Sequence, residues 1–204
     1  MTGPDDLPDW DIDQQIRCPA AVLPVPASVH RNPRGRRVIV GVPGLGWRGD
    51  LRGDSPVVQG SRTYVPVLPE MEWYRAESER IEVFAPLVPV DRVWVESLDE
   101  TPASTAAGSD LISRLVSLDE PARRSPVPAR DSIGLTGKRL IQTPAPGEPA
   151  GNDRRDLRAV TEPYTSSDGD ICVRVAVELD WYRWAWTGQA PRTLVVPVHL
   201  LWVE

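Results

Sequence analysis

The chain has 204 residues, 25% of them charged, and a formal net charge of −6, which are ordinary values for a globular protein that buries a core. Proline accounts for 22 residues, about twice its usual share of ~5%, so a coiled coil or other long-helix protein is excluded. An acidic chain also has no general attraction for phosphate backbones or anionic membranes.

Residues 1–35 form the first predicted segment, a Pro-rich and acidic N-terminal arm. Five aspartates lie within the first 13 positions, where a signal peptide would be basic and then apolar. No uncharged apolar run approaches the ~20 residues that a membrane-spanning helix needs. Cys18 and Cys172 are too far apart in sequence to form a metal motif, so we expect two reduced thiols. These features, with 22 arginines against one lysine, favour a bacterial, cytoplasmic protein with no membrane contact.

An internal repeat organises the rest of the chain. Residues 70–96 align without a gap with residues 178–204, and ten of the 27 positions are identical. Weaker matches continue upstream, where Asp50-Leu51-Arg52 aligns with 156–158 and Arg37 aligns with Lys138. The sequence therefore predicts an internal duplication, with a first β-barrel repeat at 36–98 and a second at 137–204.

The segment between the repeats, residues 99–136, is rich in Pro, Ser, Ala and Thr and is predicted to be a linker. It holds one short helix over residues 109–119, where leucine and isoleucine recur at helical spacing.

The second repeat contains the clearest alternation of the chain. Val173, Val175, Val177, Leu179 and Trp181 share one face, and the polar or aromatic residues between them share the other, out to Trp186. A period of two predicts a half-buried strand with the valines inside and Glu178 accessible. The first repeat keeps the same pattern over residues 65–74.

The short strands, the prolines before the final strand (Pro86 and Pro89) and the ending Val93-Trp94-Val95-Glu96 resemble a small SH3-like barrel. This resemblance implies a mainly β protein built of two tandem SH3-like units. Another all-β arrangement and an α+β fold stay open as alternatives.

Catalytic and metal signatures are weak. The two histidines, His30 and His199, stand outside any nucleophile–base or metal-ligand motif. Glu70, Glu178, Glu72 and Asp180 are expected to form solvated ion pairs on the outward face, and no cofactor or metal is predicted. An enzyme with a site between the two repeats is our third hypothesis.

A basic arm suggests the second hypothesis. Residues 30–37 carry four arginines, Arg31, Arg34, Arg36 and Arg37, which could contact phosphates of a nucleic acid. The net charge and the acidic segment just upstream oppose this interpretation.

The favoured hypothesis is a non-catalytic protein-interaction or adaptor module. In the predicted strand, an aromatic–acidic strip (Glu178, Asp180, Tyr182, Trp184 and Trp186) lies on the outward face. The first repeat has Ala76 and Ser78 where the second has Trp184 and Trp186, so these rings are not required by the repeat. Aromatic rings beside carboxylates suit a cationic or proline-rich protein segment. The other interpretation is that the strip packs against the first repeat or the linker.

Overall fold

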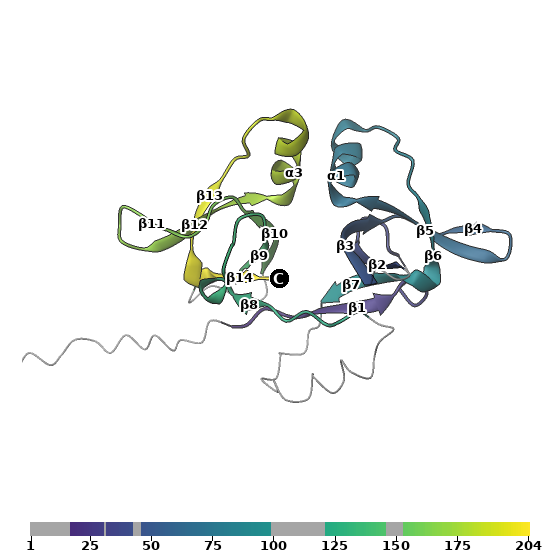
Figure 1. Cartoon of the computed structure of the whole chain (residues 1–204), viewed down its shortest axis with the longest axis horizontal. Coiled ribbons are helices and arrows are strands. Elements are labelled where there is room, and N and C mark those ends of the chain that lie inside the picture. The colour runs from purple at the N-terminus through teal and green to yellow at the C-terminus, as the bar shows by residue number, and fades with distance from the viewer. Residues whose placement is uncertain (1–16, 31, 43–45, 99–120, 146–152) are drawn as a thin grey trace, which may run out of the picture.

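The computed structural model describes residues 17–30, 32–42, 46–98, 121–145 and 153–204. Two antiparallel sheets of seven strands each form barrel-like units that lie side by side, and one helix belongs to each unit (Figure 1). The expectation of a mainly β protein is confirmed. The helix predicted at 109–119 lies outside the described residues.

The first unit has the strand order β1-β7-β2-β3-β5-β4, with β6 also paired to β5. Its elements are β1 (Val22–Pro26), β2 (Arg37–Val42), β3 (Gly46–Gly53), β4 (Val57–Gln59), β5 (Arg62–Pro69), α1 (Glu70–Glu79), β6 (Leu87–Pro89), the 3-10 helix η1 (Val90–Arg92) and β7 (Val93–Leu98).

The second unit has the strand order β11-β12-β10-β9-β14-β8, with β13 also paired to β12. Its elements are β8 (Val127–Pro128), the 3-10 helix η2 (Ala129–Asp131), β9 (Arg139–Gln142), β10 (Arg154–Ala159), β11 (Tyr164–Thr165), β12 (Ile171–Val177), α3 (Glu178–Thr187), β13 (Leu194–Pro197), the 3-10 helix η3 (Val198–Leu200) and β14 (Leu201–Val203). From β5 and from β12 onward, both units run through strand, α-helix, strand, 3-10 helix and strand.

The strand predicted through residues 173–186 ends at Val177, so the prediction is wrong for its second half. Helix α3 begins at Glu178, where two acidic residues in the first turn interact favourably with the helix dipole. Gly188 ends the helix with a positive φ of 71°, a conformation that glycine adopts without strain. In the first unit the helix likewise starts directly after Pro69, and the predicted strand stops there.

Two short strands come from segments that were expected to lie outside the barrels. Strand β1, in the predicted arm, pairs with β7, and β8, in the predicted linker, pairs with β14. Both belong to a tetrapeptide, Pro-Val-Pro-Ala, that occurs at 24–27 and again at 126–129. Its alanines, Ala27 and Ala129, are buried in the two cores. The first unit therefore begins at Val22 and the second at Val127, earlier than the repeats at 36–98 and 137–204 that the sequence comparison found.

Each unit has its own apolar core, in which the predicted inward residues Val173 and Val175 are completely buried. The first core consists of Ala27, Val38, Val40, Leu51, Val65, Val67, Val93 and Val95. The second consists of Ala129, Leu135, Leu140, Leu157, Ala159, Val173, Val175, Val196, Val198 and Leu201. Both cysteines are free thiols. Within the described ranges, no helix has the length and apolarity to span a bilayer.

Candidate functional site

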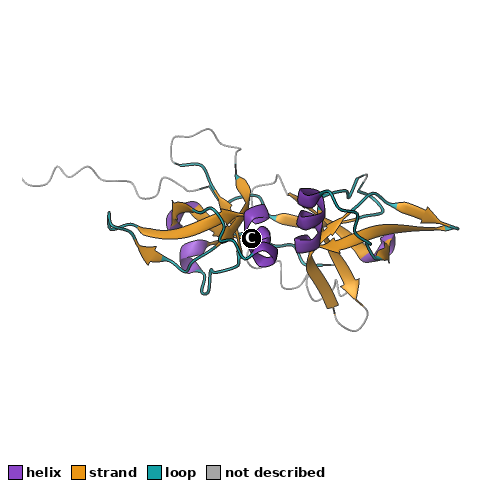
Figure 2. Cartoon of the chain, turned by 90° about the horizontal axis from the view of Figure 1, so that it is seen from above, coloured by secondary structure: helices purple, strands orange, loops and turns teal. Residues whose placement is uncertain are grey.

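The two helices meet where the units face one another. Helices α1 and α3 approach each other across the gap between the sheets in both views of the molecule (Figures 1 and 2). The rings of Tyr74, on α1, and Tyr182, on α3, stack with centroids 5.4 Å apart and planes 24° from parallel. An approximate two-fold relation therefore connects the two units at this contact.

Two glutamates lie directly beneath this stack. Glu70 and Glu178 are the first residues of α1 and α3, one helical turn before the tyrosines, and each is only 1% exposed. The expectation of solvated carboxylates is therefore wrong for both. The strand pattern placed Glu178 outward, but as the first residue of a helix it points into the interface between the units.

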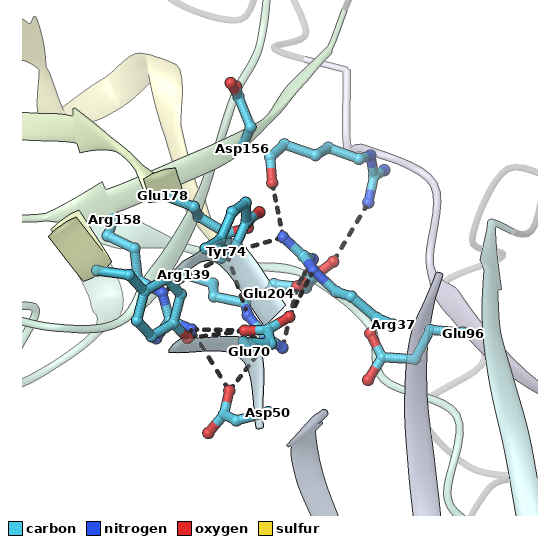
Figure 3. Close-up of polar contacts among 12 residues, drawn as sticks. Arg37, Asp50, Glu70, Tyr74, Glu96, Arg139, Asp156, Arg158, Glu178 and Glu204 are labelled. Atoms are coloured by element: carbon cyan, nitrogen blue, oxygen red, sulfur yellow. Dashed lines mark hydrogen bonds and ion pairs between the residues drawn. The ribbon is translucent and has the colours of Figure 1, made fainter. Parts of the chain in front are cut away.

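Four arginines surround the two carboxylates, two from each unit, and we call the six residues the arginine–glutamate cluster. Its members are Arg37, Arg52, Arg139, Arg158, Glu70 and Glu178. Arg37 donates to Glu178 across the interface at 2.9 Å, and Arg139 donates to Glu70 in the opposite direction (Figure 3). All four guanidinium groups lie within ion-pairing distance of both glutamates.

The tyrosine hydroxyls complete the cluster. Tyr74 accepts from Arg52 at 2.8 Å and donates to Glu178 at 3.0 Å. Tyr182 accepts from Arg158 at 2.6 Å and donates to Glu70 at 2.7 Å. Burial and the neighbouring glutamate raise the pKa of each tyrosine, so both hydroxyls keep their protons and act as donors.

The cluster holds its ionised groups strongly. Burial alone would raise the pKa of Glu70, but the charges of Arg139 and Arg52 outweigh it and lower that pKa. Burial would lower the pKa of Arg139, yet the charges of Glu70 and Asp50 raise it. Since the charged forms of Glu70, Arg37 and Arg139 are favoured by their neighbours, the cluster is an ionic core and not a set of poised acids and bases.

Two further carboxylates balance the surplus of positive charge. Four arginines face two glutamates, and the second pair of anions comes from Asp50, 2.7 Å from Arg139, and Glu204, 2.7 Å from Arg37. The approximate two-fold relation between the units does not hold for these two carboxylates. The sequence equivalent of Asp50 is Asp156, which pairs with Arg154, and that of Glu204 is Glu96, which pairs with Arg124 at 2.6 Å.

Strand pairing corrects one alignment within the cluster. In the first unit Val38 pairs with Val95, and in the second Leu140 pairs with Val203. Because 95 and 203 are equivalent positions, Arg37 corresponds to Arg139. The upstream sequence match, which paired Arg37 with Lys138, was one residue out.

A cavity of about 370 Å³ opens on the side of the cluster that faces Glu204. It is lined by Val22, Arg34, Gly35, Arg36, Arg37, Arg52, Glu96, Leu98, Arg155 and Glu204. Both glutamates are nearly covered, with side chains 4% and 5% exposed. Burial raises the pKa of Glu96 although Arg124 opposes the shift.

The structure separates the residues of the predicted aromatic–acidic strip. Glu178 and Tyr182 face the first unit. Asp180, half-buried, pairs with Arg183 at 3.6 Å, and Trp184, 39% exposed, packs edge-to-face against Trp181. Trp186 is half-buried. A second hollow of about 350 Å³ adjoins Asp180 and is otherwise lined by Arg183, Gln189, Ala190, Pro191 and Arg192.

The basic arm is divided in the same way. Arg37 belongs to the buried cluster and is committed to its glutamates. Arg34 pairs with Asp54 at the surface at 3.5 Å, and Arg36 is exposed at the mouth of the cavity. Arg31 lies outside the described residues.

The arginine–glutamate cluster is better suited to stabilising the interface between the units than to catalysing a reaction. The described part of the chain holds no group of three or more metal-ligating side chains. Sequence reasoning singled out Glu70, Glu178 and Tyr182, and it singled out Arg37 for a different role, as a contact to nucleic acid. It missed Arg52, Arg139 and Arg158 as site residues, and their one signal in the sequence was that arginine recurs at these positions in both repeats. No protein-family model, curated protein or solved structure matches this chain.

Proposed function

We propose that the protein is a non-catalytic interaction module that binds a proline-rich protein segment on the outer side of α3. The observation that carries this proposal is Trp184, which is 39% exposed on that helix and packs against Trp181. Trp186 is half-buried and, two residues further along the helix, points to another side of it. The equivalent positions of α1 hold Ala76 and Ser78, so the helix forms without the rings. Large aromatic side chains added to an exposed surface are typical of binding sites.

Charge favours one of the two partners expected from the sequence. Only Asp180 of the two acidic residues is accessible, and it already pairs with Arg183. The adjoining hollow carries Arg183 and Arg192 against this one carboxylate. A cationic segment would meet net positive charge there, whereas an uncharged proline-rich segment would gain stacking on the rings at no electrostatic cost.

We further infer that the chain arose by internal duplication of one SH3-like unit. The same order of elements, the repeated Pro-Val-Pro-Ala segment and the two-fold cluster support duplication. A 3-10 helix after a proline precedes the last strand in both units, which supports the SH3-like resemblance. In this interpretation the arginine–glutamate cluster fixes the units against each other and orients α3.

The experiment uses the double variant Trp184→Ala, Trp186→Ser, which gives α3 the residues of α1. Titration with a short proline-rich peptide should give a Kd that rises about 30-fold or more, the ~2 kcal/mol typical of aromatic hot spots. Trp47→Ala is the matched control, since Trp47 is equally exposed (41%) but lies on β3. Equal peptide binding by the double variant and the wild type would overturn the proposal, as would a large fall in unfolding temperature with binding retained.

The second hypothesis, a nucleic-acid-associated protein, keeps less support. Of its described arginines, Arg37 is engaged by buried carboxylates, which leaves Arg34 and Arg36 to contact phosphates. Salt-dependent retention of DNA or RNA that disappears on Arg34→Ala, Arg36→Ala would restore it. The third hypothesis, an enzyme between the repeats, gains a cavity but no nucleophile–base pair among its lining residues.

A further inference from the structure

The cavity beside the cluster has an unusual balance of charge. Five arginines and two glutamates line it, so positive charge dominates although the whole chain is acidic. Arg37 and Arg52 direct their charge at the cluster glutamates. The remaining three arginines, Arg34, Arg36 and Arg155, therefore set the electrostatic character of the open volume.

Arg155 is only weakly compensated by carboxylates. Its side chain is 14% exposed, and its nearest carboxylates, on Asp153 and Glu204, lie 3.8 and 4.0 Å away, too far for strong hydrogen bonds. Its Nη2 donates to the backbone carbonyl of Ala20 at 2.7 Å, whereas Nη1 is buried with no hydrogen-bond acceptor among the described residues. Burial lowers the pKa of Arg155, and the two carboxylates do not restore it, in contrast to Arg37, whose pKa is raised. A buried cationic donor without an acceptor destabilises the unliganded protein.

Arg36 adds a second available cation at the mouth of the same cavity. Its side chain is exposed and makes no ion pair or hydrogen bond with the described part of the chain. Arg34, beside it, has a single exposed carboxylate partner at 3.5 Å. Three guanidinium groups thus border one volume, and among the described residues none of them has a carboxylate partner closer than 3.5 Å.

We propose that this cavity binds a small phosphate-bearing compound, with the phosphate held by Arg155, Arg36 and Arg34. Guanidinium groups donate two parallel hydrogen bonds to an oxyanion, and a phosphate group has enough oxygens to engage several of them at once. A single carboxylate would satisfy only one. The site is assembled from both units, because Arg34 and Arg36 precede β2 and Arg155 lies on β10.

The size and the rim of the cavity limit the ligand. A volume of about 370 Å³ is at the small end of ligand pockets, large enough for a phosphate with a compact organic group. Val22 and Leu98 supply an apolar wall opposite the arginines. Glu96 and Glu204 also line the cavity but are nearly covered, so we expect the phosphate to lie nearer to Arg34 and Arg36.

The test is calorimetric titration of the full chain with inorganic pyrophosphate, with sodium chloride adjusted to keep the ionic strength constant. We expect saturable binding in the millimolar range or tighter. Arg36→Ala should weaken it by roughly 10–100-fold, the loss of one or two charged hydrogen bonds. Arg75→Ala, which removes an exposed arginine of α1, should leave it unchanged. Because Arg155→Ala could disturb folding, Arg36→Ala is the primary variant and its unfolding temperature is measured in parallel.

Three outcomes would overturn the proposal. The first is no saturable binding of pyrophosphate, and the second is equal binding by Arg36→Ala and wild type. The third concerns nucleic acid. A single-stranded oligonucleotide that binds tightly and that pyrophosphate does not displace would assign the arginines to nucleic acid instead.

Discussion

Replacing Glu178 with glutamine keeps the shape of the side chain and removes one buried negative charge. The carboxylate accepts from Arg37 at 2.9 Å and from the Tyr74 hydroxyl at 3.0 Å, and three more guanidinium groups lie within 3.5 Å. In Glu178→Gln, the four arginines would share Glu70 as the one remaining carboxylate that lies within ion-pairing distance of them all. The amide would also present two donors to a site that supplies only donors.

The expected magnitude follows from burial. Breaking a buried ion pair by removing one partner costs about 3–5 kcal/mol, because the opposite charge stays desolvated. Here the four arginines are 10–13% exposed and can turn toward Asp50 and Glu204, so we expect a loss near the lower end, about 3 kcal/mol. That is a large share of the ~5–15 kcal/mol that stabilises a typical domain.

Urea unfolding followed by tryptophan fluorescence measures this loss. Glu79→Gln is the control: Glu79 pairs with Arg75 at 3.1 Å on the exposed side of α1 and should cost only about 0.3–0.5 kcal/mol. High salt should reduce the small loss of stability in Glu79→Gln and leave the large loss in Glu178→Gln, since buried charges are poorly screened. If Glu178→Gln and Glu79→Gln lose equal stability, the cluster does not hold the units together and our account of the interface is wrong.

Three other predictions concern stability. Leu157→Ala, at a completely buried core position, should cost about 2–5 kcal/mol in the same unfolding assay. Because the pKa of Glu70 is lowered in the folded state, the ionised carboxylate stabilises the fold above the ordinary glutamate pKa of 4.5, and this stabilisation is lost as the pH falls below that value. Unfolding measured over a range of acid pH should show the loss, and Glu70→Gln should remove the part of the pH dependence that comes from Glu70. The pKa of Glu96 is raised, so its ionisation destabilises the fold as the pH rises above 4.5, and thermal unfolding at several pH values should show that Glu96→Gln removes this part of the pH dependence.

The repeated segments and the cores could be predicted from the sequence because they depend on local patterns. Period-two alternation identified Val173 and Val175 as buried, and the match at 70–96 located the shared order of elements. Beyond residue 177 the alternation of apolar and polar residues continues, but the chain forms a helix there. The sequence also carries helix signals in this segment, namely acidic residues in the first turn and Gly188 at the end. The helix forms because it can pack against helix α1 of the first unit.

The cluster could not be predicted because it depends on how the two units sit together. Glu70 and Glu178 look like surface residues in any single-unit pattern, and glutamate is rarely buried unless it is paired. Their partners come from strands far away in sequence, such as Arg37 with Glu178. The recurrence of Arg52 as Arg158 was visible, but recurrence alone does not tell a buried residue from an exposed one.

The crossed contacts of the cluster limit how far the two halves of the chain can diverge. The positions of Arg37, Arg52, Glu70 and Tyr74 hold the same residue types in the other unit, while only ten of the 27 residues of the ungapped segment are identical. A change in one half removes a partner from the other, so it is tolerated only with a matching second change. If the units arose by duplication, these four pairs of positions must evolve together, whereas the outer surface of α3 was free to acquire its tryptophans.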